Sequence, residues 1–198
     1  MSSTQVAEKD ASAAAPQMVN GVDVGRLFDT VAAVKQTPAL AKFSFRAEHR
    51  WLGGAHNRTT VGDFYGACQT HPRSAPFVID KDEHPALLGE DRGPNPVEYV
   101  LAALAGCLTT SLVYHAAAQG IEIEAVEATL EGDCDLRGFL GLDESVRNGY
   151  EGIRVSYKIK AEASAEKLRE LVELAQRRSP VFDIVSNPVP VSVRAEKA

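Results

Sequence analysis

Cysteine is scarce in this sequence, and the histidines that could join it in a metal site are scattered. The 198 residues contain three cysteines, Cys68, Cys107 and Cys134, and no Cys-x-x-Cys pair. An odd number of separated cysteines argues against a disulfide framework, and structural zinc needs about four close ligands. Since the histidines form neither His-x-His nor His-Glu-x-x-His spacing, we predict no catalytic metal.

The sequence also has no concentrated positive charge and no apolar segment near its start. Its formal net charge is −6, and its longest cluster of basic residues is the pair Arg177–Arg178, which argues against nucleic-acid binding. Residues 1–17 have neither the basic nor the apolar part of a secretory signal. These features predict a soluble, cytoplasmic protein that binds neither nucleic acid nor membrane.

One long apolar segment is present, at residues 96–118, and its length alone would permit a membrane span. It contains Glu98 and His115 together with the polar run Thr109–Ser111, and it lacks flanking Lys or Arg anchors. We therefore predict that it is the buried central helix of a soluble domain.

Composition and periodicity divide the chain into three parts. Residues 1–20 are rich in Ala, Ser and Gln and are predicted to be a disordered tail. Residues 21–40 are predicted to be a helical extension, because apolar residues recur at helical spacing within 22–36. Residues 41–198 are predicted to form one domain.

Alternating apolar and polar residues predict strands on both sides of the central helix. The predicted strands are residues 41–52, 58–65 and 75–85 before it, and 121–136, 150–163 and 188–196 after it. Ser164 is a predicted N-cap for an amphipathic helix at 165–178, and residues 179–187 read as a short helix or turn. Strands and helices in separate blocks indicate an α+β fold with mainly antiparallel sheet.

The central helix has a well-defined predicted start. Asn95 suits the N-cap, Pro96 suits the first helical position, and Glu98 completes a capping-box pattern. Cys107 follows nine residues after Glu98, within a run of small residues. An ideal helix places residues at this spacing on opposite sides, so only substrate, a distorted first turn or a second subunit could bring the two into one site. By pattern alone, the preferred interpretation of Cys107 is a small buried apolar residue.

The segment "PNPVEYVLAALAGCLTTSLVYHAAAQGI" resembles the central helix of the OsmC/Ohr family of cysteine-based hydroperoxide reductases. The later segments "IEIEAVEATLEGDCDLRGFLGL" and "SPVFDIVSNPVPVSV" are similar to the family's later strands and second active-site segment, so the resemblance covers residues 41–195. It implies antiparallel sheets around a long buried helix in an intertwined homodimer, with two active sites at the subunit interface and no cofactor.

The resemblance also implies roles for individual residues. Cys107 would be the nucleophile that attacks the O–O bond of an organic or other hydroperoxide and becomes a sulfenic acid. Glu98 and an arginine from the N-terminal strands would hold its thiolate; Arg58 is the first choice, with Arg50 and Arg46 as alternatives.

Ser179 departs from the family pattern, because it stands where the active peroxidases have a resolving cysteine before a proline. It is expected to line the substrate pocket, and by pattern alone it is a helix N-cap before Pro180. An external thiol would then reduce the sulfenic acid, or Cys134 or Cys68 would resolve it. Alternatively the redox cycle is lost, leaving a non-catalytic small-molecule-binding or structural dimer, or Cys107 handles another electrophile such as a thioester or persulfide.

Overall fold

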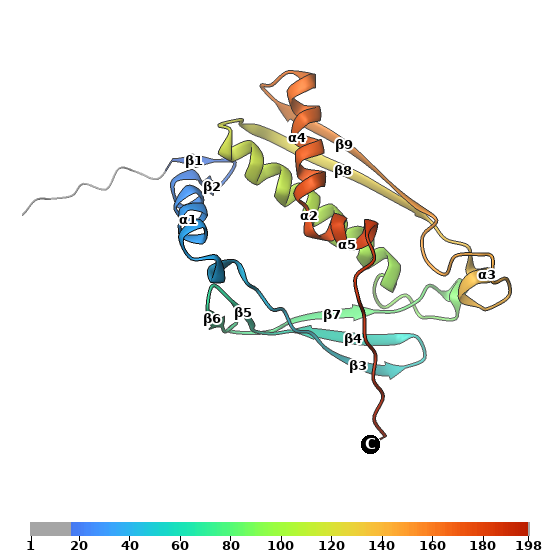
Figure 1. Cartoon of the computed structure of the whole chain (residues 1–198). Coiled ribbons are helices and arrows are strands. Elements are labelled where there is room, and N and C mark those ends of the chain that lie inside the picture. Colours follow the sequence, from blue (N-terminus) through green and yellow to red (C-terminus); the bar gives the residue numbers. More distant parts are fainter. Residues whose placement is uncertain (1–16, 198) are drawn as a thin grey trace, which may run out of the picture.

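The structure is a computed structural model that describes residues 17–197. The chain folds as a mixed α+β protein in which paired strands run antiparallel and one long helix lies between two sheets (Figure 1). This arrangement confirms the fold class predicted from the sequence.

The helices are α1 Val24–Gln36, α2 Pro96–Ala118, α3 Leu136–Phe139, α4 Ala165–Arg178 and α5 Pro180–Ser186, with short 3-10 turns at Pro38–Ala41 and Pro85–Leu87. Within residues 17–197 the strands form four separate sheets. Their members are β1 Met18–Val19 with β2 Val22–Asp23, β3 Glu48–Gly53 with β4 His56–Val61 and β7 Phe77–Lys81, β5 Phe64–Gly66 with β6 Gln69–His71, and β8 Ile123–Asp133 with β9 Gly152–Ala161.

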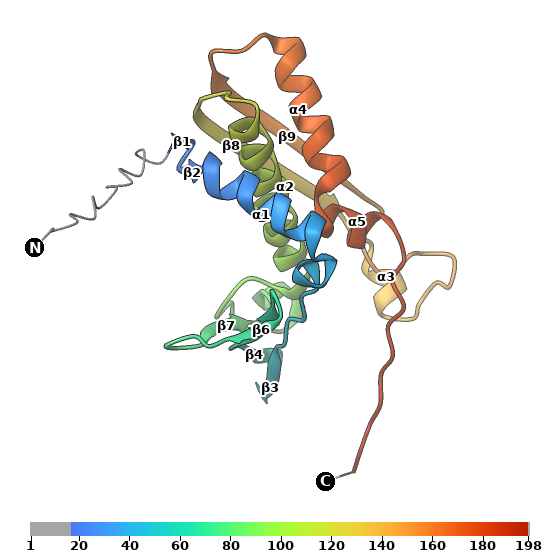
Figure 2. The same cartoon turned by 60° about the vertical axis from the view of Figure 1, so that its left-hand side comes forward.

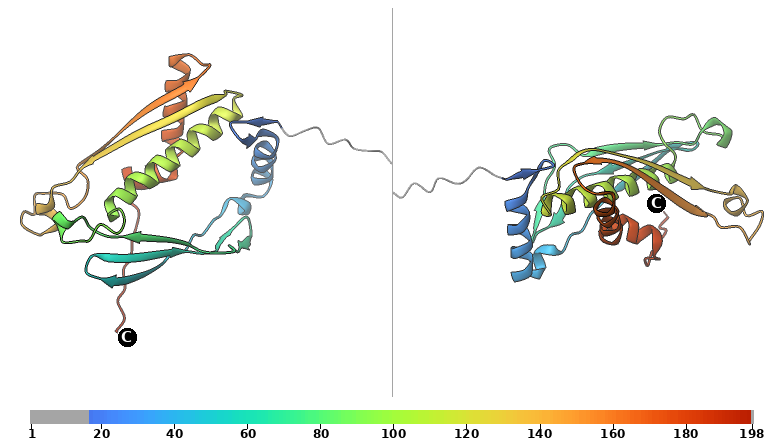
Figure 3. Two further views of the ribbon diagram at one scale, coloured as in Figure 1. Left: turned by 180° about the vertical axis from the view of Figure 1, so that it is seen from behind. Right: turned by 90° about the horizontal axis from the view of Figure 1, so that it is seen from above.

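The central helix α2 buries one stripe of side chains. Leu104, Leu108, Leu112 and Ala116, spaced four residues apart, are each at most 5% exposed. Leu112 and Ala116 pack with Leu171 of α4 into a core that β8 and β9 cover from the other side (Figures 1 and 3). The helix therefore contributes one buried face to the core, in agreement with the central helix predicted from the sequence. Although α2 is long and apolar enough to cross a membrane, it packs here as a core helix.

A small hairpin joins the N-terminal segment to the far end of α2. Asn20, in the turn between β1 and β2, donates from Nδ2 to the Ile121 carbonyl at 2.9 Å and accepts from the Ile123 amide at 2.8 Å. The disordered tail predicted for residues 1–20 falls largely outside the described residues, and residues 18–20 belong to this hairpin instead. Helix α1 then crosses toward the β3–β4–β7 sheet (Figure 2).

The N-terminal sheet has the strand order β3–β4–β7. The strand predicted at 41–52 begins only at Glu48, and the one predicted at 58–65 is divided into β4 and β5. Large apolar side chains of this region stay exposed: Phe45 is 71% exposed and Trp51 is 70% exposed.

The strand predicted at 188–196 is absent from the described structure. This segment leaves the body of the molecule as extended chain (Figure 1), with Val191 79% and Val193 89% exposed. A strand needs a neighbouring backbone for its hydrogen bonds, and no described segment pairs with this one. The alternation of apolar residues therefore did not suffice to define a strand within the single chain.

Candidate active site

The first turn of α2 is fixed by the predicted capping box. The Asn95 side chain accepts from the Glu98 amide at 2.9 Å, and the Glu98 carboxylate accepts from the Asn95 amide at 2.8 Å. Both bonds satisfy amide groups that have no partner inside the helix. The first turn is thus regular, which removes a distorted turn as a way of bringing Glu98 to Cys107.

Cys107 lies in the middle of α2 and is partly buried. It directly precedes Leu108 of the buried stripe, so it sits at the flank of that stripe. Beside it, a side chain added at Gly106 would meet no atom within 4 Å. Glu98 is roughly 14 Å away along the helix axis at about 1.5 Å per residue. The two predicted site residues therefore share a helix but do not meet within one chain.

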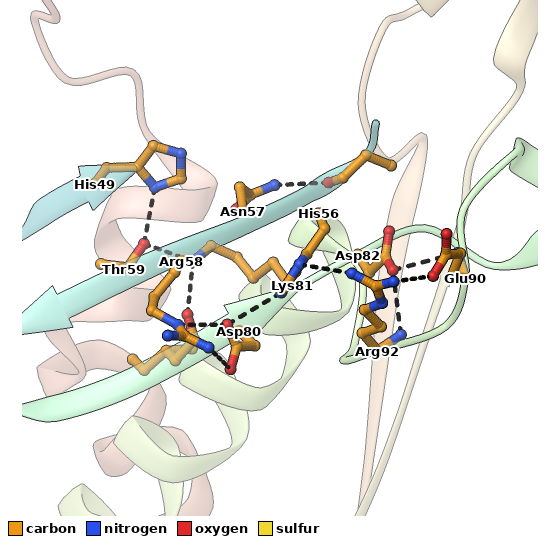
Figure 4. A network of polar contacts seen from close by, with 12 residues as sticks. His49, His56, Asn57, Arg58, Thr59, Asp80, Lys81, Asp82, Glu90 and Arg92 are labelled. Atoms are coloured by element: carbon orange, nitrogen blue, oxygen red, sulfur yellow. Dashed lines mark hydrogen bonds and ion pairs between the residues drawn. The ribbon is translucent and has the colours of Figure 1, made fainter. Parts of the chain in front are cut away.

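Arg58 lies on β4, and its guanidinium is held by Asp80 of β7 (Figure 4). Nε donates to Oδ1 at 2.8 Å and Nη2 donates to Oδ2 at 3.0 Å, which is a two-point contact. The alternative Arg50 lies directly opposite Arg58 in the β3–β4 register. Arg58 is thus paired with a carboxylate, but this partner is Asp80 and not Glu98.

Asp80 also contacts a second residue of β4 and one residue of α2. His56 contacts Asp80 Oδ1 through Nε2 at 3.2 Å, and the Tyr99 hydroxyl donates to the Asp80 backbone carbonyl at 2.9 Å. The hydrogen bond from Arg58 is the main reason why the pKa of the Asp80 carboxyl is lowered. Sequence reasoning missed Asp80, because in an alternating strand it reads as an ordinary solvent-facing residue. Asp80 is recognised only from the register of β4 and β7, which places it opposite Arg58.

A buried carboxylate fixes the loop that leads into α2. Asp82, 2% exposed, accepts hydrogen bonds from the amides of Glu83, Glu90 and Arg92. Burial opposes its ionisation, but these amide donors outweigh burial and lower the pKa of Asp82. Arg92 then reaches back to His56 Nδ1 at 3.3 Å. The loop is therefore attached to the same sheet that carries Arg58.

Ser179 is 2% exposed and joins α4 to α5. Its hydroxyl oxygen accepts from the Phe182 amide at 3.2 Å, so the predicted role as N-cap is confirmed. Since α5 packs against α2, Ser179 lies at the start of a helix that contacts the central helix.

The other candidates for thiol chemistry lie in separate places. Cys134 follows β8, and burial, followed by Glu151 and Asp133, raises the pKa of its thiol. Cys68 is exposed in the turn of the β5–β6 hairpin. His115 is eight residues beyond Cys107 on α2, too far for a hydrogen bond to it, and burial lowers its pKa. Within residues 17–197, no group of His, Cys, Asp or Glu is arranged to hold a metal ion.

A cavity of about 220 Å³ lies between α2, β9, α4 and α5. Its lining is mostly apolar and consists of Leu108, Leu112, Ile153, Val155, Tyr157, Val172, Ala175, Gln176 and Phe182. Burial raises the pKa of the Tyr157 hydroxyl. Because Leu108 adjoins Cys107 in sequence, the cavity borders the helix segment that carries the thiol.

Comparison of the sequence with models of known protein families assigns this chain to a family. A family model described as "OsmC-like protein" matches residues 89–194, which is more than half of the chain. The chain therefore belongs to the family of OsmC-like proteins. Among curated proteins, none matches it.

Solved structures share the fold at low sequence identity. An OsmC-like protein from Mycoplasma pneumoniae is 16% identical, with 73% of this chain and 89% of that chain covered and a TM-score of 0.56. An OsmC-like protein of unknown function from Vibrio cholerae is 12% identical, with coverages of 71% and 92% and a TM-score of 0.55. An organic hydroperoxide resistance protein from Legionella pneumophila is 19% identical, with coverages of 72% and 88% and a TM-score of 0.52.

Proposed function

We propose that this protein is a thiol-dependent hydroperoxide reductase with Cys107 as its nucleophile. The observation that carries the proposal is the position of Cys107 on the central helix of an OsmC-family domain, partly buried, at the flank of the core, beside open space at Gly106. The name of the Legionella relative supports hydroperoxides as the substrate class.

The reaction follows from the chemistry of a thiolate. Cys107 Sγ attacks the terminal oxygen of the hydroperoxide, so that an S–O bond forms while the O–O bond breaks. The alkoxide leaves and takes a proton to become an alcohol, and Cys107 becomes a sulfenic acid. Because Ser179 carries no thiol, two external thiol molecules complete the cycle: they become a disulfide, and the sulfenic oxygen leaves as water. We place this cycle in the cytoplasm, where thiols are kept reduced.

We propose a homodimer as the working form. Phe45, Trp51 and Phe77 are between 62% and 71% exposed in the single chain, and apolar area of this kind is normally covered. Because the first turn of α2 is regular, Glu98 cannot reach Cys107 of its own chain. A second copy would supply an arginine or a glutamate to Cys107 instead. Light scattering of the wild-type protein measures this state directly.

The experiment that tests the reaction is intact-protein mass spectrometry after brief, stoichiometric cumene hydroperoxide, with dimedone present to trap sulfenic acid. We expect a single adduct that maps to Cys107. Cys68→Ser and Cys134→Ser are matched controls that should keep the adduct, whereas Cys107→Ser should lose it and stay folded. Slow oxidation spread over all three cysteines would contradict the proposal.

A second candidate is a non-catalytic protein that binds a small apolar molecule. The cavity of about 220 Å³ favours this function, because its lining is mostly apolar and includes the polar groups of Tyr157 and Gln176. Ligand pockets in proteins commonly combine apolar walls with a few polar groups. In that case Cys107 would form no dimedone adduct, yet 2-phenyl-2-propanol, an apolar alcohol, would still raise the melting temperature.

A further inference from the structure

Asp80 connects three elements around the start of α2 (Figure 4). Its carboxylate takes two hydrogen bonds from Arg58 and one contact from His56, both on β4. Its backbone carbonyl accepts from the Tyr99 hydroxyl, and Tyr99 follows Glu98 in the first turn of α2. One residue of β7 therefore touches both the candidate arginine and the turn that carries the candidate glutamate.

We propose that Asp80 is a positioning residue, which fixes the Arg58 guanidinium relative to the first turn of α2. The inference rests on the proposed function, because the fixed Arg58 guanidinium would contact the Cys107 thiolate of this chain or of a second copy. Asp80 itself touches neither the thiol nor the hydroperoxide in this role.

The geometry of the pair supports positioning rather than simple neutralisation. Asp80 uses Nε and Nη2 of Arg58, which is one edge of a planar group with five donors. The remaining Nη1 edge is left for a second acceptor, so that the guanidinium can serve a thiolate while Asp80 keeps its orientation. A lysine would keep the charge but could not form this two-point contact.

The surroundings hold Asp80 in place from both sides. It lies directly opposite Arg58 in the antiparallel β4–β7 register. On the other side, a side chain at Gly93 would come within 2.6 Å of the Asp80 carbonyl oxygen, so the loop passes close to the strand there. Since a guanidinium can only donate, His56 Nδ1 accepts from Arg92, and His56 Nε2 carries the hydrogen that it donates to Asp80.

The test compares Asp80→Asn with a matched control, Asp133→Asn. Asp133 pairs with Arg154 across β8 and β9, so its replacement also removes an exposed arginine–carboxylate pair, but far from Arg58 in the chain. We expect Asp80→Asn to slow sulfenic-acid formation at Cys107 by roughly ten- to a hundredfold, a common loss when a group that orients a functional residue is removed. Asp133→Asn should stay within about twofold, as expected for a surface pair.

A double-mutant cycle separates positioning from a general structural effect. If Asp80 acts through Arg58, the rate of Asp80→Asn/Arg58→Ala equals that of Arg58→Ala alone. An additive further loss in the double variant, or a wild-type rate in Asp80→Asn, would overturn the proposal. Should Asp80→Asn fail to fold, Asp80→Glu and Arg58→Lys carry the same test: Asp80→Glu should keep part of the rate, and Arg58→Lys should lose it.

A spectroscopic readout keeps this inference distinct from the proposed reaction. The Arg58 Nε–H signal in a ¹⁵N–¹H spectrum should lie apart from those of solvated arginines in the wild type, and should join them in Asp80→Asn. If wild-type Cys107 forms no sulfenic acid, the proposed reaction fails, but this signal still reports whether Asp80 fixes Arg58. An Arg58 signal unchanged by Asp80→Asn would refute the positioning role.

Discussion

The elements around the far end of α2 bury apolar side chains against one another, whereas the β3–β4–β7 sheet is linked to the start of α2 mainly by polar contacts. In the first region Leu112 and Leu171 are each 1% exposed. In the second, the Tyr99 hydroxyl donates to the Asp80 carbonyl and the Lys81 ammonium lies 5.7 Å from the centre of the Tyr99 ring, while Phe45 of the preceding segment is 71% exposed.

One region therefore buries its apolar side chains within a single chain, whereas the other leaves large aromatic side chains exposed. Apolar burial is the main favourable contribution to folding, so the α2–α4–β8–β9 region has its own source of stability. The N-terminal sheet carries arginines and carboxylates in defined positions but leaves its aromatic side chains uncovered. A second copy of the chain, as proposed above, would cover them.

Truncation of the central core should give the largest effect. Leu112→Ala removes a side chain that packs with Ala116, Leu171 and Ala175. We expect the free energy of unfolding to fall by about 2–5 kcal/mol, because the loss of buried methyl groups adds to the cost of a cavity. Urea unfolding measures this, and a change below about 1 kcal/mol would mean that the site collapses or that this core is not formed.

The matching change in the other region should act through association. Phe45→Ser replaces a ring whose centroid lies 5.5 Å from that of Phe64, at an interplanar angle of 33°, and that is 71% exposed. If a second copy covers it, the dimer dissociation constant rises about tenfold or more, as for other buried aromatic anchors. The melting temperature should then fall below that of the wild type at the same protein concentration, because association contributes less stability when the dissociation constant is larger. Melting curves that do not change with concentration in either protein would mean that no second copy covers Phe45.

The same contrast explains what could be predicted from the sequence. The capping box of Asn95 and Glu98 depends on residues three apart, and the N-caps Ser164 and Ser179 are equally local, so all were predictable. Asp80 could not be found, because its role depends on the β4–β7 register and on Tyr99, 19 residues away. The strand predicted at 188–196 has no partner among the described residues, so local alternation had nothing to pair with.

Removal of the helix caps should have intermediate effects that differ with burial. Ser164 caps α4 in solvent through the Lys167 amide at 3.1 Å, and Ser164→Ala should cost about 1 kcal/mol. Ser179 does the same for α5 at a buried position, so Ser179→Ala should cost about 1–3 kcal/mol, because the Phe182 amide is left without a partner. Thermal unfolding of both variants measures the difference, and equal losses would show that the Phe182 amide reaches water.

Acidification should have the smallest effect and should act on the N-terminal sheet through Asp80. Its carboxyl pKa is lowered in the folded protein, first by the hydrogen bond from Arg58 and further by His56. The stability that this pair contributes is therefore fully present above the ordinary aspartate pKa of about 3.9, and is lost as the pH falls through the lower folded value. We expect the Arg58 Nε–H signal to stay unchanged from neutral pH down to about pH 4 and to move toward that of a solvated arginine below it. If the signal instead already moves well above about pH 4, a group other than the Asp80 carboxyl controls the pair.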